Sequence, residues 1–156
     1  SWSDNPAMIN AISDISGVYS GQLKKAVRGI AILNNKFVMI RDEIETTGTQ
    51  AVIRWNLLTS ATVEGLDVNS AILTKNGKKL YIKVKEPQGV TMKTWSTTSP
   101  NSYDAANPGT TFVGFETTVP ANTAAALTVY LLPEGSESID TTAVKKLSQW
   151  PVSSGK

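Results

Sequence analysis

The sequence predicts an all-β protein, a two-layer antiparallel β-sandwich of about nine or ten strands. Short runs rich in β-branched and aromatic residues follow one another through most of the chain, and turn residues separate them. Several of these runs alternate apolar and polar side chains, the period of a strand with one face in the core. The connections between most runs are short, which favours antiparallel pairing within two packed sheets.

Three strands are expected in succession near the start of the chain. The first, residues 23–33, ends at Asn34 and Asn35, a pair that tolerates the positive φ of a tight hairpin turn. The second, residues 36–44, is apolar on both parities at its start, which indicates that both of its faces are covered there. The third, residues 51–59, alternates apolar and polar side chains. Its apolar face carries Ala51, Ile53, Trp55 and Leu57. Trp55 is therefore expected in the core.

A second hairpin is predicted in the middle of the chain. Short strands are expected at residues 61–64 and 70–74, and Asn76-Gly77 is a strong hairpin signal before the strand 78–85. One face of this last strand is apolar and the other is basic. The basic face carries Lys79, Tyr81, Lys83 and Lys85. Lysine on an exposed face discourages edge-to-edge aggregation, and we favour this interpretation over a site for an anionic ligand.

The remaining strands are expected at residues 90–95, 110–119 and 124–132. Between the first two lies a long polar loop, residues 96–109, with two X-Pro steps and few apolar residues. Loops of this length tend to be functional or disordered.

The two ends of the chain show less regular patterns, and we interpret the whole sequence, residues 1–156, as one domain. Residues 1–22 are expected to form an irregular lead-in, with two alternatives open: its apolar residues lie along a sheet, or part of it forms a short helix. These apolar residues are Met8, Ile9, Ile12, Ile15 and Val18. Residues 134–156 are expected to form a tail with one helical turn around residues 143–147, and Trp150 is expected to dock on the body of the domain.

Composition limits the partners. The net charge is only +2 and basic residues do not form a dense block, so we expect neither nucleic acid nor a membrane surface as a partner. No apolar run approaches the length of a membrane-spanning segment. The sequence contains no signal-peptide pattern, and the absence of cysteine fits either an oxidising or a reducing compartment.

The chemistry available to the chain is narrow because it contains neither histidine nor cysteine. The usual general base, the usual zinc ligands and the thiol nucleophile are all missing, so we predict no catalytic residue, metal site or cofactor. The densest acidic cluster is Asp42, Glu43 and Glu45. Adjacent strand residues point to opposite faces, so we favour ion pairs with Arg41 and Arg54 over a metal site.

Aromatic side chains can stack on sugar rings, which makes Trp95, Tyr103 and Tyr81 candidate substrate-binding residues, with Lys83 as a basic neighbour. Trp95 stands at the mouth of the long loop and Tyr103 lies within it. The alternative is packing, and for Trp95 we favour a place in the core.

Several segments together resemble the C-terminal β-sandwich of heparinase II/III-like polysaccharide lyases. The pattern is an arginine-led strand, a hydrophobic strand that reaches an aspartate, and a tryptophan strand. The similar segments are residues 17–23, 28–33, 37–44, 52–59, 107–116 and Trp150-Pro151. The resemblance covers most of the chain.

The resemblance implies a fragment of a larger lyase. Such proteins join an N-terminal helical toroid, which supplies most catalytic residues, to a C-terminal sandwich. Zinc sites in that family use histidines, which this chain lacks. The resemblance therefore implies a non-catalytic domain that braces the toroid of a periplasmic or secreted enzyme and contacts an acidic polysaccharide such as a glycosaminoglycan. The alternative is an autonomous carbohydrate-binding or adhesive sandwich.

Overall fold

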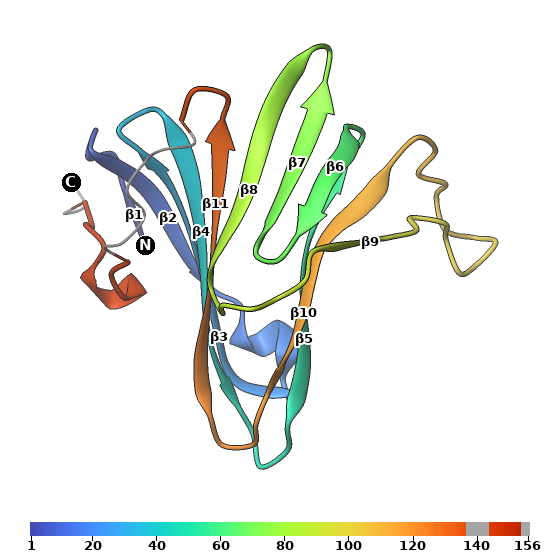
Figure 1. Cartoon of the computed structure of the whole chain (residues 1–156). Helices are drawn as coiled ribbons and strands as arrows, with labels where there is room; N and C mark the ends of the chain where they lie inside the picture. Colours follow the sequence, from blue (N-terminus) through green and yellow to red (C-terminus); the bar gives the residue numbers. More distant parts are fainter. Residues whose placement is uncertain (137–143, 154–156) are drawn as a thin grey trace.

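The computed structural model describes residues 1–136 and 144–153, and within them the chain forms eleven strands and two short 3-10 helices (Figure 1). The predicted all-β antiparallel sandwich is confirmed. The strands are β1 (Trp2–Ser3), β2 (Met8–Asp14), β3 (Leu23–Leu33), β4 (Phe37–Thr46), β5 (Ala51–Thr59), β6 (Thr62–Asp67), β7 (Ser70–Lys75), β8 (Lys78–Glu86), β9 (Lys93–Trp95), β10 (Thr111–Val119) and β11 (Ala124–Pro133).

The strands form two sheets of very different width. The large sheet has eight strands in the order β1-β2-β3-β4-β11-β8-β7-β6, and the small sheet has three in the order β5-β10-β9. The hairpin between β3 and β4 turns at Asn34 and Asn35, and that between β7 and β8 turns at Asn76; all three have positive φ angles, as their sequence predicts.

The main core lies between the two sheets. Along β5 the predicted apolar face packs inward, and the ring of Trp55 stacks on that of Phe115 from β10 at 5.9 Å between centroids. The predicted place of Trp55 in the core is confirmed. We call the face of the large sheet that carries this core its inner face, and the opposite face its outer face.

A second apolar cluster covers the outer face of β3, β4 and β11, where the C-terminal segment packs on it. The 3-10 helix η2 (Leu147–Gln149) and Trp150 lie over Gly29, which has no side chain to obstruct them. The predicted docking of Trp150 is confirmed, because this residue is buried. The helical turn expected around residues 143–147 begins at Leu147 instead, and residue 143 lies outside the described residues.

The structure differs from the sequence predictions at two other places. Residues 1–22, expected to be irregular, contain β1, β2 and the 3-10 helix η1 (Ser16–Tyr19). The irregular lead-in was wrong for β2, because all seven of its residues pair with β3, whereas the alternatives of a sheet strand and a short helix match β2 and η1. The strand expected at residues 90–95 is limited to β9, because Val90 and Met92 are anchored in the core beside the β6–β7 turn.

Candidate functional site

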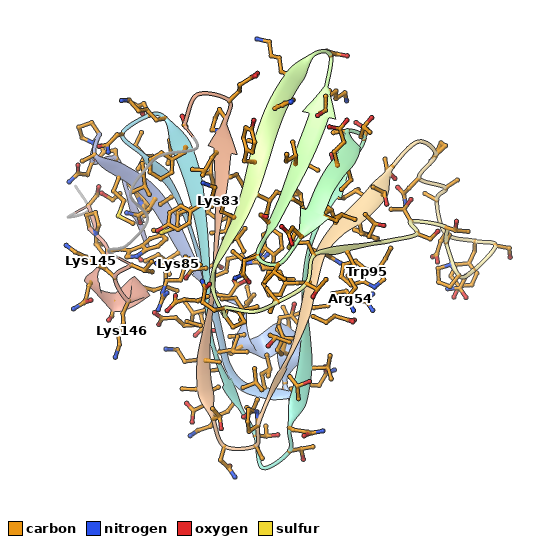
Figure 2. The ribbon with its side chains drawn as sticks, in the orientation of Figure 1. Arg54, Lys83, Lys85, Trp95, Lys145 and Lys146 are labelled. Carbon is orange, nitrogen blue, oxygen red and sulfur yellow. The ribbon has the colours of Figure 1, made fainter. Side chains whose placement is uncertain are left out.

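The solvent face of the small sheet carries the most distinctive group of side chains, which comes from all three of its strands. The guanidinium carbon of Arg54 on β5 lies 4.6 Å from the ring centroid of Trp95 on β9. The ammonium nitrogen of Lys93, also on β9, lies 5.6 Å from the same centroid. Glu116 on β10 stands between the two cations. We call these four residues the tryptophan–cation cluster; Figure 2 shows Arg54 and Trp95 together on the small sheet.

Strand register explains why the cluster forms. Arg54 pairs directly with Glu116, and Trp95 pairs with Phe112, which precedes Glu116 by four residues on the same face of β10. Between these positions lies Gly114, where an added Cβ would stand only 2.0 Å from the backbone oxygen of Trp55. The glycine therefore permits the close approach of β5 and β10, and it leaves the centre of this face flat.

Glu116 holds both cations by hydrogen bonds. Lys93 Nζ donates to Glu116 Oε2 at 2.8 Å, and Arg54 Nε and Nη2 donate to Oε1 at 2.9 and 2.8 Å. The hydrogen bond from Lys93, which has the largest effect, and those from Arg54 lower the pKa of the Glu116 carboxyl below its usual range. The carboxyl is therefore ionised at neutral pH. Two cations face one carboxylate, which leaves the cluster with a net positive charge beside an aromatic face.

Trp95 lies on this solvent face and in neither apolar cluster, so the favoured interpretation of a core residue was wrong. β9 is only three residues long, too short for a pattern of apolar and polar residues to indicate on which face Trp95 lies. A tryptophan face beside guanidinium and ammonium groups can stack a sugar ring while the cations bind an anionic substituent.

The four predicted substrate-binding residues do not meet at one place. Tyr103 is 83% exposed in the long loop beyond β9. Tyr81 and Lys83 lie on β8 in the large sheet, and Tyr81 packs against the second apolar cluster. Figure 2 shows Lys83 on a different part of the molecule from Trp95.

Arg54, Lys93 and Glu116 were not among the predicted site residues. Arg54 alternates with apolar residues in β5, a pattern that indicated only a solvated face, and no sequence motif marked Lys93 or Glu116. The pairing of Arg54 with Glu116 depends on the register of β5 and β10, which the sequence does not specify.

The predicted acidic cluster forms ion pairs. Arg28 donates two hydrogen bonds to Asp42, at 2.6 and 2.8 Å, and the hydrogen bond to Asp42 raises the pKa of the Arg28 guanidinium. Lys24 pairs with Glu45 at 2.5 Å. Arg54 was wrongly predicted as a partner of this cluster, because β5 belongs to the other sheet. Within residues 1–136 and 144–153, no group of acidic side chains is arranged to hold a metal ion.

Arg41 has a structural role on the outer face of the large sheet. Its side chain, 7% exposed, donates to Glu43 at 3.1 Å, to Thr128 at 2.7 Å and to Glu86. Glu43 Oε1 also accepts the backbone N–H of Leu147 at 2.9 Å, which fastens the C-terminal segment. Burial, the largest effect, raises the pKa of Glu43, but the bond from Leu147 and the charge of Arg41 outweigh it and leave that pKa below the usual range.

A small cavity of about 150 Å³ opens at the edge of β5, between the two sheets. The Arg28–Asp42 pair lines one side and β5 lines the other. Among the described residues no helix is long and apolar enough to cross a membrane.

No protein-family model and no curated protein sequence matches this chain. The fold, in contrast, is similar to solved structures of heparinase III and of a heparan sulfate lyase. A crystal structure of heparinase III aligns with a TM-score of 0.65 and 18% identity, over 85% of this chain and 20% of that one. Heparan sulfate lyase HepC from Pedobacter heparinus aligns with a TM-score of 0.62 and 13% identity, over 85% and 21%. The chain thus spans about a fifth of the length of these enzymes, and the resemblance seen in the sequence extends to the fold.

Proposed function

We propose that this chain is a non-catalytic sandwich domain of a heparinase II/III-like polysaccharide lyase. The observation that carries the proposal is the fold likeness, which extends over 85% of this chain but only 20% of heparinase III. A domain that occupies a fifth of such an enzyme leaves most of the polypeptide available to supply the catalytic groups, which supports the proposal. The lack of histidine and cysteine in this sequence supports the same division of labour.

In this proposal the domain has two tasks. It braces an N-terminal helical toroid in which elimination takes place, in a periplasmic or secreted parent enzyme. It also contacts the acidic polysaccharide through the tryptophan–cation cluster. Trp95 stacks on a sugar ring, and Arg54 and Lys93 bind sulfate or carboxylate groups, since both cations already hold one carboxylate, that of Glu116.

The first test is an eliminase assay on this chain alone. Heparan sulfate and alginate are incubated with the purified chain, and the absorbance of the unsaturated product is followed. We expect no turnover. Turnover that persists through repurification would contradict a non-catalytic domain. The full-length gene product, assayed in parallel, is expected to depolymerise at least one uronic-acid polymer, and an inactive product on a broad substrate panel would contradict the lyase assignment.

A second candidate, an autonomous carbohydrate-binding or adhesive module, is favoured by one observation. The tryptophan–cation cluster is complete within this chain and needs no residue from elsewhere. Glycan-array binding by the chain, lost in Trp95→Ala and retained in Trp2→Ala, would support it. Trp2 is a suitable control because it is also exposed but lies on the other sheet. Binding without lyase activity in the full-length product would favour this candidate over the first.

A further inference from the structure

An apolar strip crosses the inner face of the large sheet at its β1–β4 end. Strand register defines it, because directly paired residues in antiparallel strands share a face. One row of paired residues runs across four strands and a second row runs beside it. The first row is Trp2, Ala11, Ile30 and Ile40, and the second is Ile9, Ile32 and Val38. All seven side chains are apolar, and we call them the apolar strip.

The strip is exposed to solvent over most of its length. The exposed fractions are 58% for Trp2, 46% for Ile30, 41% for Ile32 and 37% for Ile9. Together these side chains expose apolar surface on the order of a few hundred Å², the size at which a patch on a soluble protein marks an interaction surface.

The strip continues the sandwich core. Ile40, at its inner end, packs against the main core cluster, and the same rows extend to Val129 and Leu131 on β11. Farther from the core, the residues of these rows on β1, β2 and β3 have no such cover. The strip is therefore the part of the core layer that the small sheet does not reach.

The width of the small sheet explains this gap. Three strands lie over an eight-stranded sheet, and Figure 1 shows β1 and β2 on the side of the molecule away from β5, β9 and β10. In the part of the chain that the structure describes, β10 is the sole strand paired with β5, so β5 has a free edge. The cavity of about 150 Å³ lies at this edge, beside the Arg28–Asp42 row that adjoins Ile30 and Ile40.

The opposite face of the same strands shows what a covered surface looks like in this fold. There the C-terminal segment places Leu147 and Trp150 against Gly29 and buries both side chains. Around Ile30 and Ile32, β3 thus has one face covered by its own chain and one apolar face open.

We infer that the apolar strip is the docking surface for another segment of the same, longer polypeptide. The inference rests on the proposed function, which makes this chain one domain of a larger enzyme. The similar structures are about five times as long as the part this chain matches, so they contain ample chain to cover such a surface. The occupant presents an apolar face, because the strip carries no charged side chain and its one polar side-chain group is the indole N–H of Trp2. An acidic polysaccharide presents charged groups, and so it does not match the apolar strip.

The absence of native cysteine permits a direct test. Ile30→Cys is introduced into this chain and into the full-length gene product, and the rate of labelling by a soluble thiol reagent is compared. We expect fast labelling in the isolated chain and labelling at least about tenfold slower in the full-length product. Val52→Cys is the matched control: Val52 is 65% exposed on the solvent face of the small sheet. Its labelling rate is expected to be the same in both proteins.

Equal labelling of Ile30→Cys in the two folded proteins would overturn the inference. Ile32→Cys provides a second probe if circular dichroism shows that Ile30→Cys misfolds. Slow labelling in the isolated chain, with sedimentation as a dimer, would also overturn it by making a second copy the occupant. The eliminase assay is a separate readout. If the full-length product is an active lyase but Ile30→Cys is labelled fast, only the docking inference is contradicted. If Ile30→Cys is protected in the full-length product but that product is inactive, only the lyase function is contradicted.

Discussion

Gly29→Ala tests how closely the C-terminal segment packs on the outer face of the large sheet. A Cβ added at Gly29 would lie 2.4 Å from Leu147 Cδ2 and 2.8 Å from Trp150 Cζ3. Non-bonded carbon atoms prefer a separation of about 3.5–4.0 Å, so the segment must move outward by about 1 Å. Both contacts are side-chain atoms, and the strain falls on the segment rather than on β3.

Two responses are available, and their free energies differ. Overpacking of a well-packed site costs about 1–3 kcal/mol. Complete release of the segment would expose Trp150, whose burial of about 200 Å² is worth about 5 kcal/mol at 25 cal/mol per Å², and Leu147 in addition. The segment therefore shifts and stays docked, and the free energy of unfolding falls by about 1–3 kcal/mol.

The assay is urea unfolding followed by circular dichroism. Gly48→Ala is the control, because an added Cβ there meets no atom within 4 Å. Alanine also restricts the unfolded chain by about 0.4–1 kcal/mol, an effect that both variants share, so their difference isolates the contact with the segment. Equal stability of the two variants would show that Leu147 and Trp150 do not pack on Gly29 as described.

Three further predictions concern other contacts of the two sheets. Gly114→Ala is expected to destabilise the protein more than Gly29→Ala in the same urea assay, since its Cβ meets backbone; equal or smaller loss contradicts the close approach of β5 and β10. Arg41→Met leaves Glu43 without its buried partner and is expected to cost about 3 kcal/mol, whereas an unchanged unfolding midpoint contradicts a structural ion pair. Because folding lowers the pKa of Glu43, its stabilisation is complete at neutral pH and declines as the pH falls through that pKa. The NMR shift of the Leu147 amide should titrate at a pH below the usual glutamate pKa, and a midpoint above the usual value contradicts the bond.

The positions of most strands could be predicted from the sequence. The bounds of β3 and β5 match the predicted runs, because turn residues such as Asn34 and Asn35 interrupt strong β patterns. Alternation along β5 also identified the face that carries Trp55 in the core. Local signals suffice where strand period and turn chemistry coincide.

The assignment of strands to sheets was harder to predict from the sequence. β4 and β5 are consecutive in the chain yet belong to different sheets, and for that reason Arg54 pairs with Glu116 and not with the acidic cluster on β4. The tryptophan–cation cluster depends on the register of three strands separated by long stretches of sequence. Such a site forms from tertiary pairing, so inspection of single segments finds Trp95 and misses its cationic neighbours.

The start of β4 links the sequence pattern to the proposed docking surface. Its run of apolar residues on both parities predicts a strand covered on both faces. The structure covers one: Phe37 and Met39 are buried under the second apolar cluster, whereas Val38 on the opposite face is half-buried beside exposed Ile32. A polar residue at either position would have cost the isolated sandwich little, because both side chains face solvent in part. The apolar character of this face thus has no explanation in the isolated fold, and cover by the rest of a longer polypeptide supplies one.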